Sequence, residues 1–106
     1  MPAEGFVKVA ERSEIPDGKM KAIRIGTKQV MITNAGGKLY AIDNACTHVG
    51  GPLASGALEG HVVTCPWHGS KFDVRTGEVV RGPAPRPVKI HEVKVEGNDV
   101  LVEMSA

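Results

Sequence analysis

The sequence predicts an all-β fold of short antiparallel strands, and three observations lead to that prediction. Short runs rich in β-branched residues recur along the chain, turn-forming residues separate them, and no segment of useful length repeats its apolar residues at helical spacing. The turn signals are 16–19 (PDGK), 34–38 (NAGGK), 49–52 (VGGP) and 96–99 (EGND).

The first half of the chain predicts four strands, each with apolar residues at every second position. They are 6–10 (FVKVA, with Val7 and Val9 on one face), 22–26 (AIRIG, with Ile23 and Ile25), 28–33 (KQVMIT, with Val30 and Ile32) and 38–43 (KLYAID).

The second half predicts a strand at 61–65 (HVVTC) and a hairpin, in which 88–95 and 99–104 flank the turn residues 96–98 (EGN). Val88 and Ile90 share one phase of the alternation, whereas Val93 and Val95 share the other. A change of phase near residues 91–92 predicts a β-bulge or a bend there.

Length and composition limit the possible functions. A chain of 106 residues is expected to be one domain, spanning 1–106. A formal net charge of +1 gives no reason to expect nucleic acid or a membrane surface as partner. No apolar run is long enough to span a bilayer, and residues 1–14 do not have the pattern of a secretory signal. We therefore expect a cytoplasmic protein, whose two cysteines serve a metal or redox role rather than a disulfide.

Each cysteine has a histidine close by. Cys46 and His48 lie in the segment CTHVGGPL, and Cys65 and His68 lie in CPWHGSKFD. Both pairs follow a predicted strand, in segments rich in glycine and proline. A lone buried cysteine is usually a small apolar residue. Two such pairs in similar settings instead indicate a metal site with four protein ligands.

Three kinds of metal site are compatible with four such ligands to different degrees. A tetrahedral zinc site is possible, although zinc fingers usually place the two cysteines together and the two histidines together. A copper site more often clusters His, Cys and Met, and Met20, Met31 and Met104 lie elsewhere in the chain. A [2Fe–2S] cluster with two cysteines on one iron and two histidines on the other gives the mixed pairing a physical reason. Neutral imidazoles remove negative charge from such a site, so its reduction potential rises above that of an all-cysteine cluster.

The motif resembles that of the Rieske family. The resemblance is carried by CTH, CPWHGS and the later GPAPRP at 82–87, and its strong part covers about 44–87. It implies an antiparallel β-sandwich whose cluster-binding part presents two Gly/Pro-rich loops. It also implies that Cys46 and Cys65 bind the inner iron of one [2Fe–2S] cluster per chain, that His48 and His68 bind the outer iron, and that residues 82–87 cover the cluster.

The sequence differs from one branch of the Rieske family, and the differences indicate which branch it resembles. Rieske proteins of quinol-oxidising complexes carry two further cysteines that join the loops, and Gly51 and Trp67 stand at those positions here. Those proteins also place a serine and a tyrosine after the second histidine, where their hydroxyls raise the potential. This chain keeps the serine as Ser70 but has Phe72 in place of the tyrosine. The sequence therefore resembles the ferredoxins of oxygenase systems, and a potential in the lower part of the family's range is expected.

The function implied is that of a soluble, monomeric one-electron carrier rather than an enzyme. Such a carrier takes electrons from a flavin-dependent reductase and passes them to a terminal oxygenase, expected to be one that hydroxylates aromatic rings. Two alternatives stay open at this point: a Rieske-like small subunit of another redox system, such as nitrite reductase, and a structural zinc module.

Several other residues receive predicted roles. Trp67 either packs over the second loop or helps a partner to dock, and packing is the preferred interpretation. His61 and His91 are predicted not to be ligands. Two groups are less clearly assigned: an apolar rim around the ligand histidines (Val49, Pro52, Leu53, Pro83 and Pro85), and a basic region that is either a docking surface for a carboxylate-rich partner or a solvated face (Lys71, Arg75, Arg81, Arg86 and Lys89).

Overall fold

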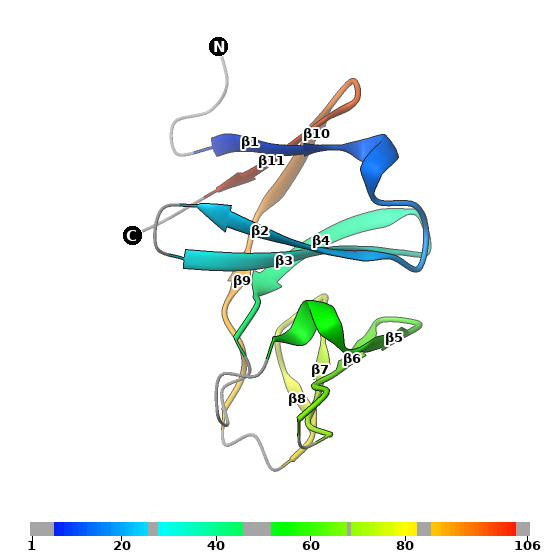
Figure 1. Ribbon diagram of the computed structural model, residues 1–106, viewed down its shortest axis with the longest axis vertical. Helices are drawn as coiled ribbons and strands as arrows, with labels where there is room; N and C mark the ends of the chain where they lie inside the picture. Colours follow the sequence, from blue (N-terminus) through cyan, green and yellow to red (C-terminus); the bar gives the residue numbers. More distant parts are fainter. Residues whose placement is uncertain (1–5, 26–27, 46–51, 68, 83–85, 104–106) are drawn as a thin grey trace.

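The computed structural model describes residues 6–25, 28–45, 52–67, 69–82 and 86–103. Three antiparallel sheets follow one another along the longest dimension of a molecule that measures 41 × 28 × 19 Å (Figure 1). The part of the chain that the structure describes contains no α-helix, only two short 3-10 turns, η1 (Arg12–Glu14) and η2 (Leu53–Ser55). The predicted all-β antiparallel architecture is confirmed. Within the described residues, no helix is long and apolar enough to cross a membrane.

The central sheet has the strand order β2-β3-β4-β9 and separates two hydrophobic cores. Its strands are β2 (Met20–Ile25), β3 (Lys28–Ala35), β4 (Lys38–Asp43) and β9 (Ile90–His91). Alternate residues of β3 serve different cores: Val30 and Ile32 pack toward the terminal sheet, and Met31 packs toward the small sheet. All three are completely buried, so this strand carries apolar residues on both faces.

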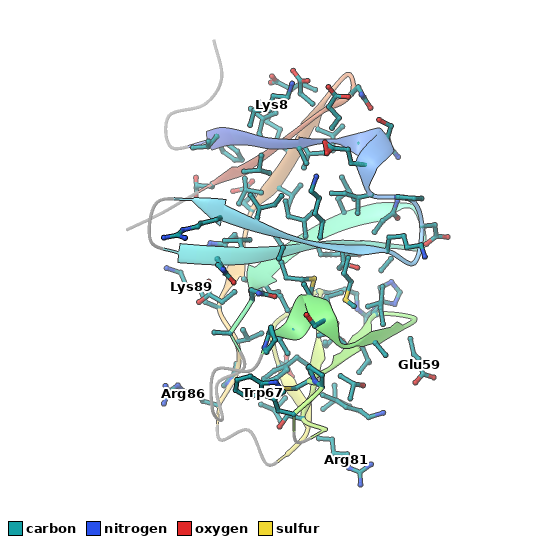
Figure 2. The ribbon with its side chains drawn as sticks, viewed as in Figure 1. Lys8, Glu59, Trp67, Arg81, Arg86 and Lys89 are labelled. Atoms are coloured by element: carbon teal, nitrogen blue, oxygen red, sulfur yellow. The ribbon has the colours of Figure 1, made fainter. Side chains whose placement is uncertain are left out.

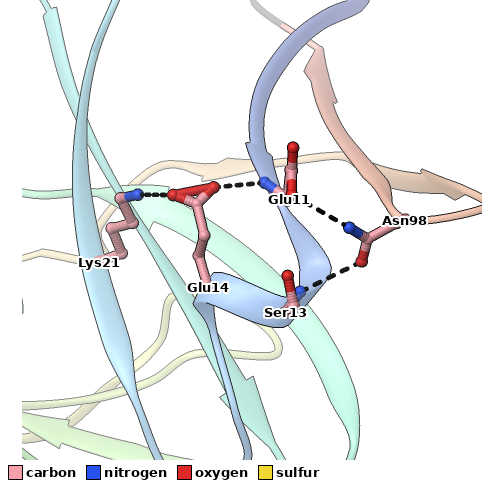
Figure 3. Close-up of polar contacts among 5 residues, drawn as sticks. All are labelled: Glu11, Ser13, Glu14, Lys21 and Asn98. Atoms are coloured by element: carbon pink, nitrogen blue, oxygen red, sulfur yellow. Dashed lines mark hydrogen bonds and ion pairs between the residues drawn. The ribbon is translucent and has the colours of Figure 1, made fainter.

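The terminal sheet, with the order β1-β11-β10, joins the two ends of the described chain. Its strands are β1 (Phe6–Glu11), β10 (Val93–Glu96) and β11 (Asp99–Glu103). The predicted hairpin about 96–98 is confirmed, since β10 pairs with β11. Figure 3 shows how its turn is fixed to η1: Ser13 donates its backbone N–H to Asn98 Oδ1 at 3.2 Å, and Asn98 Nδ2 donates to Glu11 Oε2 at 3.3 Å. Glu14 accepts hydrogen bonds from the Glu11 backbone and from Lys21, which links η1 to β2.

The small sheet, β5-β6-β7-β8, supports the predicted metal site. Its strands are β5 (Ala57–Glu59), β6 (Val62–Thr64), β7 (Lys71–Asp73) and β8 (Val79–Arg81). Residues that face one another across these strands form rows. One row, made of Leu58, Val63, Phe72 and Val79, packs in the core shared with β3 and β4. The adjacent row, at the end nearer Cys65, consists of Ala57, Thr64, Lys71 and Arg81.

The break predicted near 91–92 is the point where the chain changes sheets. β9 pairs with β4 in the central sheet, and β10, which begins at Val93, pairs with β11 in the terminal sheet. The predicted change of face at this point is wrong, however. His91 is buried, Glu92 is exposed and Val93 is partly buried, so the alternation continues through Glu92; it is interrupted earlier, where Lys89 and Ile90 are both exposed.

Other predictions about strand faces were wrong. Val7 is 43 % exposed, and Ala10 is buried instead, because the register of β1 against β11 shifts between Lys8 and Ala10. Val88 is buried, but Ile90, with the same phase, is 47 % exposed. The three-residue strands β5, β7 and β8 were not predicted at all.

Candidate metal centre

Of the four predicted ligands, the structure describes Cys65. Cys46, His48 and His68 lie outside the described residues. Cys65 directly follows β6, is only 2 % exposed, and is a free cysteine. It belongs to the core that also contains Val63 and Phe72, so this cysteine is shielded from water by the scaffold.

The second loop, residues 65–70, is closed by backbone hydrogen bonds at its base. Cys65 donates its N–H to the Ser70 carbonyl at 2.8 Å, and Gly69 donates to the Cys65 carbonyl at 3.1 Å. Gly69 has a φ of 76°, a conformation that side-chain-bearing residues rarely adopt. Cys65 and Ser70 are buried at the base, while Trp67 is 57 % exposed between them. The loop thus keeps Cys65 buried and exposes Pro66 and Trp67 to solvent.

The first loop, residues 45–52, is closed in a similar way by Asn44. The Asn44 carbonyl accepts the Leu53 N–H at 2.8 Å, and its side-chain Oδ1 accepts the Ala54 N–H at 2.8 Å. Its Nδ2 donates to Gln29 Oε1 at 3.1 Å, which ties this base to β3. Ala45 and Pro52 form an isolated β-bridge across the loop. Although residues 46–51 lie outside the described part, both ends of their segment are therefore fixed.

The third loop, residues 82–87, was predicted to cover the cluster, and residues 83–85 lie outside the described part. The chain around this loop is fixed at Gly77 and Val88. Val88 donates its N–H to the Gly77 carbonyl at 2.9 Å. A Cβ on Gly77 would lie 2.1 Å from the Val88 carbonyl oxygen, and its φ is +81°. Only glycine fits this close approach.

The residues predicted to tune the cluster lie in different environments. Ser70 and Phe72 are completely buried, and Phe72 packs in the scaffold core. Trp67 does not have the packing role preferred from the sequence, because more than half of its surface meets solvent. In the predicted apolar rim, Leu53 is completely buried and turns into the core, Pro52 is half-buried, and the other three residues lie outside the described part.

The two histidines predicted not to be ligands have other contacts. His91 is buried, and its Nε2 lies 2.7 Å from Asp43 Oδ1, while its Nδ1 has no hydrogen-bond partner. His61 makes an edge-to-face contact with Tyr40, with ring centroids 6.1 Å apart. Within the described residues, no three His, Cys, Asp or Glu side chains gather where they could hold a metal ion.

A close ion pair lies at the far end of β7 from Cys65. Arg75 donates from Nη2 and Nε to the Asp73 carboxylate at 2.8 and 3.1 Å. These side-chain hydrogen bonds hold the pKa of Asp73 below its ordinary value. The charge of Arg75 is therefore already matched within the small sheet.

What the structure shows of this region fits a metal cluster bound at its end. A buried, free thiol follows a strand, and the loop that contains it turns back on itself immediately. The base of the first loop is tied to the central sheet and that of the second lies on the small sheet, but Leu53 and Cys65 from the two bases belong to one core. Such an arrangement is needed if each loop is to supply one sulfur and one nitrogen.

Comparisons with known proteins identify the family. A model of the Rieske [2Fe-2S] domain matches residues 5–100. The biphenyl dioxygenase ferredoxin subunit of Pseudomonas sp. (strain KKS102) is 38 % identical over 101 residues, which cover 94 % of this chain and 93 % of the relative. The ferredoxin of carbazole 1,9a-dioxygenase from Nocardioides aromaticivorans IC177 superposes with a TM-score of 0.91 at 32 % identity, over 96 % of this chain and all of that one.

A further similar structure comes from a complex of reduced oxygenase and oxidized ferredoxin in carbazole 1,9a-dioxygenase. The matched chain has a TM-score of 0.89 and 32 % identity, with 94 % of each chain covered. These relatives confirm the predicted cofactor and argue against a structural zinc module. The chain belongs to the Rieske [2Fe-2S] family, and it is an electron-carrying ferredoxin of the kind that serves dioxygenase systems rather than a catalytic subunit.

Proposed function

We propose that this protein carries single electrons from a flavin-dependent reductase to the terminal oxygenase of a ring-hydroxylating dioxygenase system. The observation that carries the proposal is the match along nearly the whole length of both chains to separate ferredoxin components. The similar ferredoxin in the carbazole dioxygenase complex supports the oxygenase as the electron acceptor. The reductase is proposed from the chemistry of such systems, in which the carrier must be reduced before each transfer.

We propose Cys46 and Cys65 as ligands of the inner iron, and His48 and His68 as ligands of the outer iron. The burial of Cys65 supports this arrangement, because a thiolate end inside the scaffold leaves the imidazole end toward the loop tips. The bound cluster supplies one-electron redox chemistry. The chain keeps water from the Cys65 sulfur, fixes the bases of both loops, and presents the exposed Trp67 beside the ligand position 68. Ser70 is the proposed hydrogen-bond donor to the cluster, whereas Phe72 has no hydroxyl and packs in the scaffold core.

Three further parts of the proposal concern the state of the protein. We propose that residues 1–106 form one domain, with its cluster-binding part at about 44–87, and the family match across residues 5–100 supports this. We also propose a soluble, cytoplasmic monomer that meets its partners transiently. Size-exclusion chromatography and cell fractionation test these statements directly.

The metal content is the first test. The purified protein should contain two irons and two acid-labile sulfides per chain and give a reduced-state EPR spectrum typical of mixed Cys/His ligation. Colourless protein that binds one zinc ion, even after reconstitution with iron and sulfide, would contradict the cluster. Replacing His48 or His68 by Cys should change this spectrum, whereas His61→Ala should not.

Electron transfer to the partners is the second test. The protein should replace the natural ferredoxin in a biphenyl dioxygenase system supplied with its reductase, NADH and biphenyl. Product formation should depend on the added protein and stop with Cys65→Ser. A cluster-containing protein that the reductase cannot reduce, or that no ring-hydroxylating oxygenase oxidises, would overturn the proposed place in the electron path. A small subunit of nitrite reductase has no observation in its favour here.

A further inference from the structure

Two positive charges face one another at the cluster end of the small sheet. Lys71 and Arg81 are opposite one another in the β7–β8 pairing, next to the pair of buried Phe72 and partly buried Val79. A register shift separates the two pairs, so that Arg81 is two residues beyond Val79. Directly opposed residues project to the same side of an antiparallel pair, and like charges in such a pair are destabilising. The arrangement therefore does not serve the stability of the sheet by itself.

Some surface cations lie beside carboxylates. Lys8 lies 3.0 Å from Asp99, Arg75 lies 2.8 Å from Asp73, and Lys94 lies 3.3 Å from Glu96. Among the described residues, neither Lys71 nor Arg81 makes an ion pair. These two cations therefore face one another with no carboxylate of the described part paired to either of them.

The chain position of the pair places it beside the proposed site. Lys71 immediately follows Ser70, at the base of the second loop, and Arg81 immediately precedes the third loop. Large apolar side chains are exposed nearby in the sequence, Trp67 at 57 % and Val80 at 55 %. Figure 2 shows Trp67, Arg81 and Arg86 at one end of the molecule and Lys8 at the other.

The sequence from 52 to 89 has an excess of positive charge. It contains five cations (Lys71, Arg75, Arg81, Arg86 and Lys89) against three carboxylates (Glu59, Asp73 and Glu78), so its formal charge is +2. Since the whole chain has +1, the remaining residues sum to −1. The charge is therefore unevenly distributed, with the positive side on the cluster-binding part.

We propose that Lys71 and Arg81, together with the exposed Trp67 and Val80, form the docking surface for a carboxylate-rich region of the terminal oxygenase. This inference rests on the proposed function. An acidic partner surface would relieve the repulsion between Lys71 and Arg81 and cover the exposed apolar side chains. The oxygenase is the chosen occupant because a ferredoxin of similar structure forms a complex with an oxygenase.

A first experiment measures the charge of this surface without any protein partner. The reduced protein is oxidised in a stopped-flow instrument by ferricyanide, a trianion, and separately by a trivalent cobalt(III) hexaammine cation. At about 10 mM ionic strength the screening length is about 30 Å. Removing one charge about 10 Å from the point of electron transfer should then slow oxidation by the trianion about three- to fivefold. Arg81→Gln should show this decrease, should not slow the cobalt reaction, and should not lower the denaturation midpoint.

Lys8→Gln is the matched control, since it removes one cation at the opposite end of the molecule from Trp67 and Arg81 (Figure 2). It should leave the ferricyanide rate within about twofold of that of the native protein. Equal responses of Arg81→Gln and Lys8→Gln, or no change with Lys71→Gln/Arg81→Gln, would overturn the assignment of an anion-attracting surface.

A second experiment identifies the occupant. Single-turnover oxidation by the biphenyl dioxygenase oxygenase and single-turnover reduction by the system's reductase are measured separately. The double variant should slow the transfer to the oxygenase about tenfold or more at low salt and leave the reduction rate within about twofold. Slower reduction with unchanged oxidation would assign the surface to the reductase and overturn our choice. If native protein reduces ferricyanide but not the oxygenase, the proposed function and the oxygenase as occupant both fail, while the charge measurement stands.

Discussion

The two ends of the molecule are stabilised differently. The terminal and central sheets contain strands of up to eight residues, with continuous pairing such as that between β2 and β3, and close around a core from both sheets. The small sheet has strands of only three residues. The first end therefore has more continuous strand pairing, whereas we expect the second to rely more on its core and on the bases of its loops.

The bases of the loops are the Ala45–Pro52 bridge with Asn44, the Cys65–Ser70 hydrogen bond, and the Gly77–Val88 contact. The proposed ligation of the cluster by Cys46, His48, Cys65 and His68 would join the first two loops as well. The comparison indicates that short strands and loop bases, rather than long strand pairing, hold the proposed site.

The largest expected effect comes from removing the cluster. Cys65→Ser should lose the cluster, because one of four ligands is replaced by a hydroxyl that binds iron poorly, and a cluster and the loops it joins stabilise one another. Hydrogen exchange should then increase strongly in residues 52–82 and much less in β2–β4. Uniform loss of protection at both ends would show that the two ends unfold together.

Asn44→Ala should be the next most damaging change. It removes the acceptor of the Ala54 N–H and the partner of the Gln29 side chain. Both hydrogen bonds are only partly buried, so losing each should lower the free energy of unfolding by about 0.5–1.5 kcal/mol. Urea denaturation measures this loss, and the cluster should also be released faster by an iron chelator. Normal cluster retention at equal destabilisation would show that the base of the first loop is not needed to hold the ligands.

Phe72→Tyr tests whether the side chain at this position affects the stability of the scaffold or the potential of the cluster. Phe72 is completely buried in the core below the small sheet, so a new hydroxyl there would lack a partner and cost about 1–3 kcal/mol. The reduction potential should stay unchanged. A rise of about 40 mV, equivalent to about 1 kcal/mol for one electron, would instead show that the hydroxyl reaches the cluster. Voltammetry and denaturation of the same variant distinguish the two outcomes.

Ser70→Ala, unlike Phe72→Tyr, should change the reduction potential. Ser70 is buried beside Cys65, and its proposed hydrogen bond strengthens when the cluster gains negative charge. Losing about 1 kcal/mol of that difference should lower the potential by about 40 mV. Ser55→Ala, an exposed serine on η2, is the matched control and should leave the potential unchanged.

The smallest effect should come from Arg75→Gln. Because Arg75 lowers the pKa of Asp73 in the folded state, the pair stabilises the fold above the unfolded-state pKa of about 3.9, and this contribution disappears as the pH falls through the folded-state pKa. The variant should therefore be slightly less stable than the native protein at pH 7, with a difference that shrinks in acid. Carboxyl NMR should show the pKa of Asp73 rising toward its ordinary value, and an unchanged pKa would contradict the assigned cause.

Sequence reasoning succeeded where a local pattern has one physical cause. The runs that gave β3 and β4 combine β-branched residues with clear turn signals, and the apolar pattern of 88–95 predicted a break near residues 91–92, where the chain changes sheets. The Cys/His pairs were recognisable because a metal site needs particular atoms at particular spacings. The family comparison bore out the cofactor that they predicted.

The wrong predictions concern strands and side-chain burial that depend on contacts with residues distant in the sequence. β7 and β8 are too short to show a period, and they exist because Phe72 and Val79 are drawn into a shared core. The register shift that buries Ala10 instead of Val7 depends on a partner strand about 90 residues away in the chain. The exposure of Trp67 could not be inferred from the sequence either. An aromatic side chain in a loop can pack on its own loop or on a partner, and the composition of the loop is the same in both cases.

The closure of the chain at Gly77 and Val88 has a consequence for engineering and for divergence among related chains. Residues 78–87 lie between Gly77 and Val88, which are joined by a backbone hydrogen bond. We therefore expect the two ends of this segment, here called the cassette, to keep their positions when the residues between them change. Lengthening a loop between fixed ends costs only about 0.6 kcal/mol for each doubling of its length. Exchange of this segment between relatives should thus alter what lies over the ligand positions while the strands on either side keep their places. Gly77 itself is the one position in the cassette's frame where an added methyl group would collide with the backbone opposite.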